Sequence, residues 1–281
     1  MLLFRYFGSH ALESLRDQRL KTSRISTFND PFECMYRAVG DMTVQKAKDY
    51  LRSRIHSPTF MALSMQQFPS IKSKNDLRRI IGANHSQMIK KFVGNYESIK
   101  KKTLDERERI MDETIRVICF SQSDAMPLDE ILMWSHYAAS HRGMRIGFEF
   151  PDGITSPFKI IPIKYQSTRV PVDLSINSES DTVKDALMES IKTKSVTWSY
   201  EKEYRLLTAP VLCDRETTSE GLQSEFIGLK KEWVKRVDFG VRCPDSEIEK
   251  MNALLTDAYP HVQRYRSKYH ASEYALEYQA C

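Results

Sequence analysis

Residues 42–113 constrain the fold most strongly, because they differ in character from the rest of the chain. This stretch is polar, rich in Lys and Arg, and helical in its pattern. On either side of it lie short segments in which apolar and polar residues alternate, such as 2–7 and 143–150, as is typical of β-strands. Strands and helices that fall into separate runs favour an α+β fold. We therefore predict a single domain over residues 1–281, with a mixed or antiparallel β core and a helical insertion at 42–113.

The overall composition predicts a folded, water-soluble chain. Hydrophobic residues make up 41% of the 281 residues, which is too large a share for an intrinsically disordered protein. No window reaches the ~20 apolar residues of a membrane-spanning helix. The apolar run at the N-terminus is too short for a signal peptide. We therefore expect a cytoplasmic protein without a membrane partner.

Several common kinds of site are excluded by their missing motifs. The five cysteines are scattered and form no C-x-x-C pair, so we expect reduced thiols and no zinc site. The sequence has no P-loop, no G-x-G-x-x-G, no G-x-S-x-G and no H-E-x-x-H. The formal net charge of +5 permits a nucleotide or nucleic-acid partner without requiring one.

The strongest candidate site is the segment from Trp198 to Leu207, which we expect to form a strand over residues 199–209. On such a strand Glu201, Glu203 and Arg205 share one face. Two neighbouring carboxylates suit acid–base chemistry or ribose binding, and the adjacent guanidinium would keep one of them ionised. The alternative is a solvated charged face with an ion pair.

Two further segments could contribute polar groups to a pocket. Asn29 and Asp30 lie before a proline in a turn flanked by aromatic residues. His136 and Tyr137 share a half-polar face of a helix expected over residues 128–140. The alternatives are a well-capped turn and a helix with hydrogen-bonded core histidines. His136 and His141 point too far apart around a helix to bind one metal ion, and we predict no metal.

Blocks of residues along nearly the whole chain resemble a known bacterial family. They include Phe28-Asn29-Asp30-Pro31-Phe32-Glu33, Met133-Trp134-Ser135-His136-Tyr137, His141-Arg142-Gly143 and Glu203-Tyr204-Arg205. This pattern looks like the bacterial "domain of unknown function twenty-nine seventy-one" family, which by its name implies no particular activity.

A more distant resemblance implies a chemistry. The order of a strand, a helix with a Leu-x-x-Leu core, a strand and a later Glu-x-Glu strand is similar to the ADP-ribosyltransferases. In the arginine-type members, an Arg of the first strand holds the phosphate side of NAD. The second Glu of Glu-x-Glu grips the nicotinamide ribose. By position, the resemblance assigns these two roles to Arg5 and Glu203, and it assigns orientation of the acceptor to Glu201.

Other parts of this resemblance are looser. Ser23 and Ser26, in a second strand expected over residues 20–26, match the Ser-Thr-Ser element of these enzymes only in part. Tyr6, beside Arg5, leaves open the variant whose first strand uses His and Tyr.

Together these patterns predict an enzyme of a defence or toxin system that cleaves NAD and transfers ADP-ribose to an acceptor. The sequence does not identify whether this acceptor is a protein, a nucleic acid or a small molecule. NAD is then the substrate, and no metal takes part. The catalytic candidates are Glu203, Glu201, His136 and Tyr137. The candidates for contacting NAD are Arg5, Tyr6, Ser23, Ser26, Asn29, Asp30 and Arg205.

Two alternatives stay open at the level of the sequence. The basic insertion and the Tyr- and Arg-rich segment 264–269 would suit a non-catalytic nucleic-acid-binding module of a phage-defence or toxin system. A metal-dependent nuclease is a third interpretation. It is less favoured because Lys202 directly follows Glu201 and would point away from it.

Overall fold

A computed structural model describes residues 1–122, 127–151, 158–173, 181–217 and 223–281. The chain forms two compact units. The first comprises Met1–Cys34, Met111–Thr168 and Lys192–Cys281, and the second comprises Met35–Ile110 and Arg169–Ile191.

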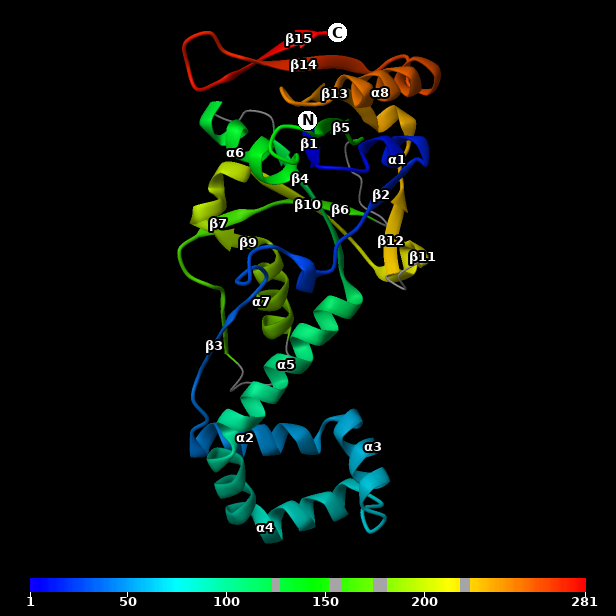
Figure 1. The fold of residues 1–281 in the computed structure, drawn as a ribbon. Helices are drawn as coiled ribbons and strands as arrows, with labels where there is room; N and C mark the ends of the chain where they lie inside the picture. The colour runs from blue at the N-terminus through cyan, green and yellow to red at the C-terminus, as the bar shows by residue number, and fades with distance from the viewer. Residues whose placement is uncertain (123–126, 152–157, 174–180, 218–222) are drawn as a thin grey trace. The chain divides into compact units, whose positions relative to one another are not determined.

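An eight-stranded sheet forms the framework of the first unit within the described part of the chain (Figure 1). Its strands, in spatial order, are β15 (Leu276–Ala280), β14 (Gln263–Tyr269), β13 (Val234–Phe239), β5 (Met144–Glu149), β1 (Leu2–Phe7), β4 (Arg116–Gln122), β10 (Glu203–Thr208) and β6 (Lys159–Pro162). Neighbouring strands are antiparallel, except that β13 and β14 are parallel. The fold is therefore α+β with a mixed, mostly antiparallel sheet, as the segregated sequence pattern predicts.

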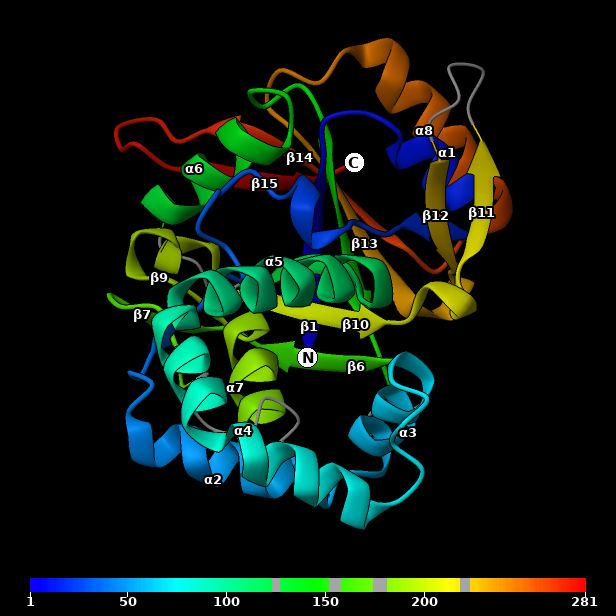
Figure 2. The ribbon, with the colours of Figure 1, turned by 90° about the horizontal axis from the view of Figure 1, so that it is seen from below.

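Two helices cover one face of this sheet and bury the main hydrophobic core. They are α1 (Ala11–Arg16) and α8 (Asp245–Ala258), which lie side by side in both ribbon views (Figures 1 and 2). Apolar residues of α8 recur at helical spacing, and Leu255 is buried with Leu15 of α1 and Val237 of β13. The hydroxyl of Tyr259 donates a 2.6 Å hydrogen bond to the carbonyl of Leu15, which ties the end of α8 to α1.

Strands β1 and β4 separate after a short paired stretch, and this separation makes room for a site. β1 pairs with β5 along its whole length, whereas its register with β4 covers only Leu3 and Phe4. Farther along β4, Val117 pairs instead with Ser23 in an isolated bridge. The expected strand over residues 20–26 is therefore wrong in extent, since β2 is confined to Arg19–Lys21 and a 3-10 turn follows at Ile25–Thr27.

A tight turn connects helix α6 (Pro127–Tyr137) to β5. Ala139, Ser140 and His141 all have positive φ angles, which is unusual for residues other than glycine. The turn ends at Gly143, where an added Cβ would lie 1.9 Å from the carbonyl oxygen of Phe7. Only glycine therefore lets the turn approach β1 this closely.

Short elements complete the first unit. One small sheet contains the strands β11 (Asp214–Thr217), β12 (Gln223–Gly228) and β2, in that spatial order. Another consists of β7 (Lys164–Gln166) paired with β9 (Thr193–Ser195). The 3-10 turns are η1 (Ile25–Thr27), η2 (Val196–Glu201), η3 (Pro210–Leu212) and η4 (Lys231–Trp233). The expected strand over residues 199–209 is thus wrong at its start. Residues up to Glu201 belong to η2, and the strand begins at Glu203.

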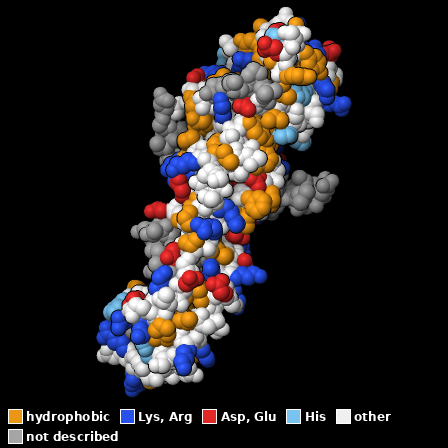
Figure 3. Space-filling model, turned by 90° about the vertical axis from the view of Figure 1, so that its left-hand side faces the viewer, with side chains coloured by type: hydrophobic (Ala, Val, Ile, Leu, Met, Phe, Trp, Pro, Cys, Tyr) orange, Lys and Arg blue, Asp and Glu red, His pale blue; other side chains and the backbone are white. Residues whose placement is uncertain are grey.

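The second unit is mainly helical. It contains β3 (Arg37–Val39) paired with β8 (Pro171–Asp173), and the helices α2 (Val44–Ile55), α3 (Pro58–Gln67), α4 (Lys74–Gly94), α7 (Asp181–Ile191) and most of α5 (Tyr96–Thr114). The side chains of Thr43, Ser57 and Ser73 cap the first three helices by accepting backbone N–H groups. Lys and Arg side chains are exposed over these helices at the lower end of Figure 3. None of the described helices is long and apolar enough to cross a membrane.

Replacing Gly143 by alanine should test the close approach of the turn to β1. We expect Gly143→Ala to destabilise the protein by about 3 kcal/mol, because the new methyl group must displace backbone atoms. Urea unfolding measures the effect. Gly82→Ala is the matched control, since a Cβ there meets nothing within 4 Å. Helix propensity should make that variant more stable by about 1 kcal/mol. Equal stabilities for the two variants would contradict the close packing of Gly143 against Phe7.

Candidate active site

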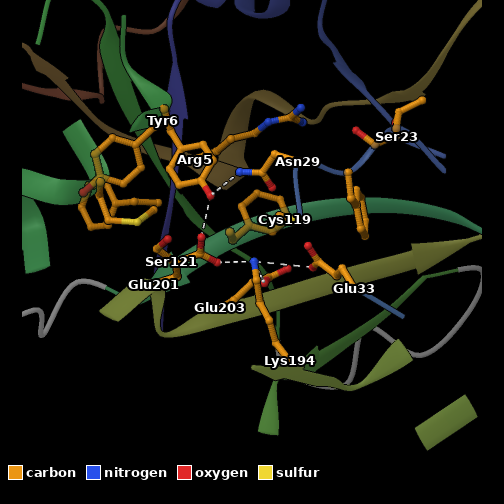
Figure 4. Close-up of a pocket in the computed structure, with 16 residues that line it drawn as sticks. Arg5, Tyr6, Ser23, Asn29, Glu33, Cys119, Ser121, Lys194, Glu201 and Glu203 are labelled. Atoms are coloured by element: carbon orange, nitrogen blue, oxygen red, sulfur yellow. Dashed lines mark hydrogen bonds and ion pairs between the residues drawn. The ribbon is translucent and has the colours of Figure 1, made fainter. Parts of the chain in front are cut away.

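A cavity of about 310 Å³ lies where β1 and β4 separate (Figure 4). Its wall combines residues from β1, β4, β10, α6 and the segment between β2 and β3. The polar side chains that line it come from Arg5, Tyr6, Ser23, Thr27, Asn29, Glu33, Cys119, Ser121, Tyr137, Lys194, Glu201 and Glu203. These residues are far apart in the sequence and belong to the first unit.

The ammonium group of Lys194 lies at the centre of a buried cluster of carboxylates. Its Nζ atom is 2.5 Å from Oε2 of Glu201, 3.0 Å from Oε2 of Glu203 and 3.5 Å from Oε1 of Glu33. The side chains of all four residues are at most 4% exposed. Burial by itself lowers the pKa of Lys194, but Glu203 and Glu201 outweigh it and raise that pKa above its ordinary value. Lys194 therefore stays charged and binds three segments of the chain together.

Arg205 is a second cation that binds two of these carboxylates, Glu203 and Glu33. It lies two residues after Glu203 on β10, so both side chains point to one face of the sheet. Its Nε donates a 2.6 Å hydrogen bond to Oε1 of Glu203, and its Nη2 donates to Glu33. Two cations thus face three carboxylates, and the cluster carries an excess negative charge when all of them are ionised.

The carboxylate of Glu201 is occupied at both oxygens. Oε1 accepts a 2.5 Å hydrogen bond from the hydroxyl of Tyr137, and Oε2 accepts from Lys194. The amide of Asn29 in turn donates to the Tyr137 hydroxyl at 3.2 Å. Burial and the negative charge of Glu201 raise the pKa of Tyr137, which therefore remains a neutral donor.

Glu203 is the carboxylate whose protonation is most finely balanced. Burial raises its pKa from 4.5 to about 7, and the charge of Lys194 opposes that shift. The backbone N–H of Glu203 donates a 2.7 Å hydrogen bond to the hydroxyl of Tyr165, which holds the start of β10 in place. A carboxylate with this pKa can be ionised or neutral near physiological pH.

Arg5 supplies a positive group at another part of the cavity wall. Figure 4 shows its guanidinium pointing away from Lys194. Its Nη1 atom is buried and has no hydrogen-bond partner among the described residues. Burial lowers the pKa of Arg5 to about 10, so it remains charged at neutral pH. A buried guanidinium nitrogen without a partner is suited to an anionic ligand.

Tyr6 is held in the cavity wall by a second buried cluster, centred on Arg145. The Nη1 of Arg145 donates to the Tyr6 hydroxyl at 3.1 Å, and its Nε donates to Asp238 at 2.6 Å. Trp134 packs edge-on against the Tyr6 ring and donates through Nε1 to the hydroxyl of Tyr278 at 2.9 Å. Trp134, from the sequence motif Met133–Tyr137, therefore holds the aromatic ring of Tyr6 in place in the cavity wall.

Most of the candidate residues from the sequence do meet at this cavity. Those that line it are Arg5, Tyr6, Ser23, Asn29, Tyr137, Glu201 and Glu203. Arg205 does not line it but binds two carboxylates that do.

Three other candidates do not line the cavity. Ser26 is exposed, and its backbone N–H donates to Asp112. The carboxylate of Asp30 is buried and accepts the N–H of Phe32, so it shapes the turn. His136 is hydrogen-bonded through Nδ1 to the Tyr200 hydroxyl at 3.0 Å.

Two important residues had no role assigned from the sequence. Glu33 is the last residue of the motif Phe28–Glu33, and its place in that motif was the only indication in the sequence that it belongs to the site. Lys194 carries no local signal, because it lies in an ordinary Lys- and Thr-containing segment. The parallel pairing of β9 with β7 and the η2 turn that follows β9 together bring Lys194 beside Glu201 and Glu203.

No group of three or more His, Cys, Asp and Glu side chains suited to a metal ion was found among the described residues. The carboxylates at the cavity are instead bound by Lys194 and Arg205. The fold and the cavity thus define an α+β protein with a buried carboxylate–lysine cluster.

The comparison with known families agrees with the motifs. Residues 133–206 match the family described as "Protein of unknown function (DUF2971)". This match confirms the family resemblance for the segment that supplies Tyr137, Lys194, Glu201 and Glu203. No curated protein and no solved structure matches the chain.

Removing the charge of Lys194 should destabilise the protein strongly. We expect Lys194→Met to cost about 3–5 kcal/mol, because it leaves buried carboxylates without their shared cation. The loss should shrink as the pH falls, since removal of the Lys194 charge raises the pKa of Glu203 further above its ordinary value in the folded variant, and protonation of Glu203 then favours the folded state. Urea unfolding at several pH values measures both effects.

The control for this variant is Lys159→Met on β6. Lys159 is exposed, so its removal should change the stability by no more than about 0.5 kcal/mol. A loss for Lys194→Met as small as that of the control would mean that the cluster is not held by this lysine.

Proposed function

We propose that the protein cleaves the bond between nicotinamide and ribose in NAD and transfers the ADP-ribose part to an acceptor. The observation that carries this proposal is the convergence of Arg5, Ser23 and Glu203 on one cavity. The resemblance to ADP-ribosyltransferases requires this convergence of the first strand, the following segment and the Glu-x-Glu region. A merely solvated charged face would not bury these residues together.

The charge distribution of the cavity supports the proposal. The cluster around Lys194 has more carboxylates than cations, so it favours a ligand part that carries or develops positive charge. The nicotinamide ring of NAD is cationic, and the ribose becomes oxocarbenium-like as the bond breaks. The unpaired Nη1 of Arg5 suits the diphosphate.

In the proposed reaction Glu203 is the catalytic residue. Its carboxylate would lie beside the ribose and stabilise the positive charge of the transition state. Lys194 and Arg205 are positioning residues, because they hold the carboxylate through its two oxygens. The aromatic side chains of Tyr6 and Phe28 in the wall would pack against the planar nicotinamide ring.

Replacing Glu203 by glutamine tests the proposed role directly. We expect Glu203→Gln to slow nicotinamide release by about 10²–10³-fold, because the neutral amide cannot stabilise the positive transition state. The release is measured with labelled NAD and the purified chain. Glu249→Gln, an exposed position on α8, should release nicotinamide at the wild-type rate. Absence of release by the wild type, or equal release by Glu203→Gln, would refute the function.

The pH dependence follows from the pKa of Glu203. Only the ionised carboxylate can stabilise positive charge, and burial raises its pKa to about 7. We therefore expect kcat/KM for nicotinamide release to fall about tenfold for each pH unit below that pKa and to level off above it. A profile measured at constant ionic strength checks this expectation. A rate that stays flat through neutral pH would contradict a catalytic role of the Glu203 carboxylate.

Arg5 should matter for substrates that carry phosphate. We expect Arg5→Met to lower kcat/KM for NAD by about 10–100-fold, the range of one or two charge-assisted hydrogen bonds. Nicotinamide riboside, which has no phosphate, should be cleaved equally by the variant and by the wild type. Steady-state kinetics with the two substrates measures the difference. An equal loss on both substrates would assign Arg5 to the structure of the cavity and not to phosphate binding.

A further inference from the structure

The net positive charge of the protein comes from its second unit. This unit carries 18 Lys and Arg residues against 12 Asp and Glu, whereas the rest of the chain carries 24 against 25. The imbalance is greatest over residues 35–110, which hold 16 Lys and Arg and 7 Asp and Glu. A charge excess confined to one part of a chain is typical of a surface that binds a polyanion.

Helix α4 has the most uneven charge of this unit. It carries five cationic residues and a single acidic residue, Asp76. The Asp76 carboxylate accepts the backbone N–H of Lys72 and the hydroxyl of Ser73, so it serves the start of the helix. All five cations are exposed, and within the described residues only Arg79 among them forms an ion pair, with Asp76. The five are Lys74, Arg78, Arg79, Lys90 and Lys91.

The exposed face of α4 forms a strip with a cation at each end. The opposite face of the helix is buried through Leu77, Ile81 and Ile89. Arg79 and Lys90 are eleven residues apart, which is three helical turns and roughly 16 Å along the axis. The residues at helical spacing between them are small and exposed. We define the α4 strip as Arg79, Gly82, Ala83, Ser86 and Lys90.

Gly82 keeps the middle of the α4 strip open. A Cβ atom added there would meet nothing within 4 Å, so no packing inside the described part of the chain requires glycine. Glycine inside a helix costs about 1 kcal/mol of stability relative to alanine. What the missing side chain does provide is room for a partner to approach the helix backbone closely.

The chemistry of the α4 strip favours double-stranded DNA over other polyanions. A membrane-surface helix needs large apolar side chains on its binding face, and the strip consists of small and cationic residues. Single strands are bound by stacking on aromatic rings, which the strip does not offer. The major groove of double-stranded RNA is too narrow for a helix, whereas that of B-form DNA is about 12 Å wide and admits one.

We propose that the α4 strip binds the phosphate backbone of double-stranded DNA at its major groove. Arg79 and Lys90 contact phosphates on the two sides of the groove, and Gly82 lets the helix enter between them. Phosphate contacts position a protein without reading the base sequence, so binding tolerates different sequences. This proposal concerns the second unit alone and does not depend on the cleavage of NAD.

The test measures the affinity of the full chain for DNA without NAD. A fluorescently labelled duplex of about 20 base pairs is titrated, and its anisotropy is followed at several salt concentrations between about 50 and 200 mM. We expect the wild type to bind with an affinity that falls steeply as salt rises. The double variant Arg79→Gln and Lys90→Gln should bind about tenfold more weakly and reduce the slope of log affinity against log salt by about 2.

A matched control separates the α4 strip from the overall charge. The double variant Lys21→Gln and Lys159→Gln removes the same charge from exposed positions of the first unit and should bind like the wild type. Equal weakening in the two double variants would overturn the assignment of binding to α4. Absence of duplex binding at the lowest salt would overturn the proposal altogether.

Gly82→Leu tests the close approach of the helix. Leucine favours a helix more than glycine, so urea unfolding should show a variant at least as stable as the wild type. Its side chain would stand in the groove, and we expect DNA binding about tenfold weaker. Unchanged binding by Gly82→Leu would contradict entry of α4 into the groove. Tighter binding of the wild type to single-stranded DNA, to double-stranded RNA or to phosphatidylserine vesicles would contradict the choice of partner.

Discussion

One ammonium group organises the functional part of this protein. Lys194 is in contact with carboxylates from the loop before β3, from the end of η2 and from the start of β10, and each contact is removed from water. Three carboxylates at such short range would repel one another strongly without a shared cation. The cluster therefore fixes the relative positions of three segments that form part of the cavity wall, and Arg205 reinforces it at Glu33 and Glu203.

The space in front of this cluster comes from the way the sheet is built. β1 stays paired with β5 but leaves β4 after Phe4, and Ser23 takes up the free edge of β4 at Val117. The separated strands leave a hollow within the first unit without exposing a long unpaired sheet edge. Arg145 and Trp134 brace Tyr6 at this hollow, so the polar cluster and the aromatic wall are supported independently.

The same features link geometry to the proposed chemistry. A buried carboxylate whose pKa lies near 7 can be ionised at neutral pH, and Lys194 and Arg205 hold it in one position. In the proposed reaction the ionised form stabilises transient positive charge. Glu201, the other carboxylate of the Glu-x-Glu pair, has a different position in the cluster. Its two oxygens are bound by Tyr137 and Lys194, so Glu201 contributes to the structure of the site.

The sequence by itself determined the α+β class, the helical character of residues 42–113 and the placement of Glu203 and Arg205 on one strand face, because these follow from periodicity and from i, i+2 spacing on a strand. It also indicated Arg5, Ser23 and Tyr137 as candidates, although their separation in the chain hid their common cavity. Only the tertiary structure decided that Lys194 lies among the carboxylates and that a left-handed Lys202 places Glu201 outside the strand. Both depend on long-range strand pairing and on a rare backbone conformation, and neither leaves a local pattern that a single sequence can display.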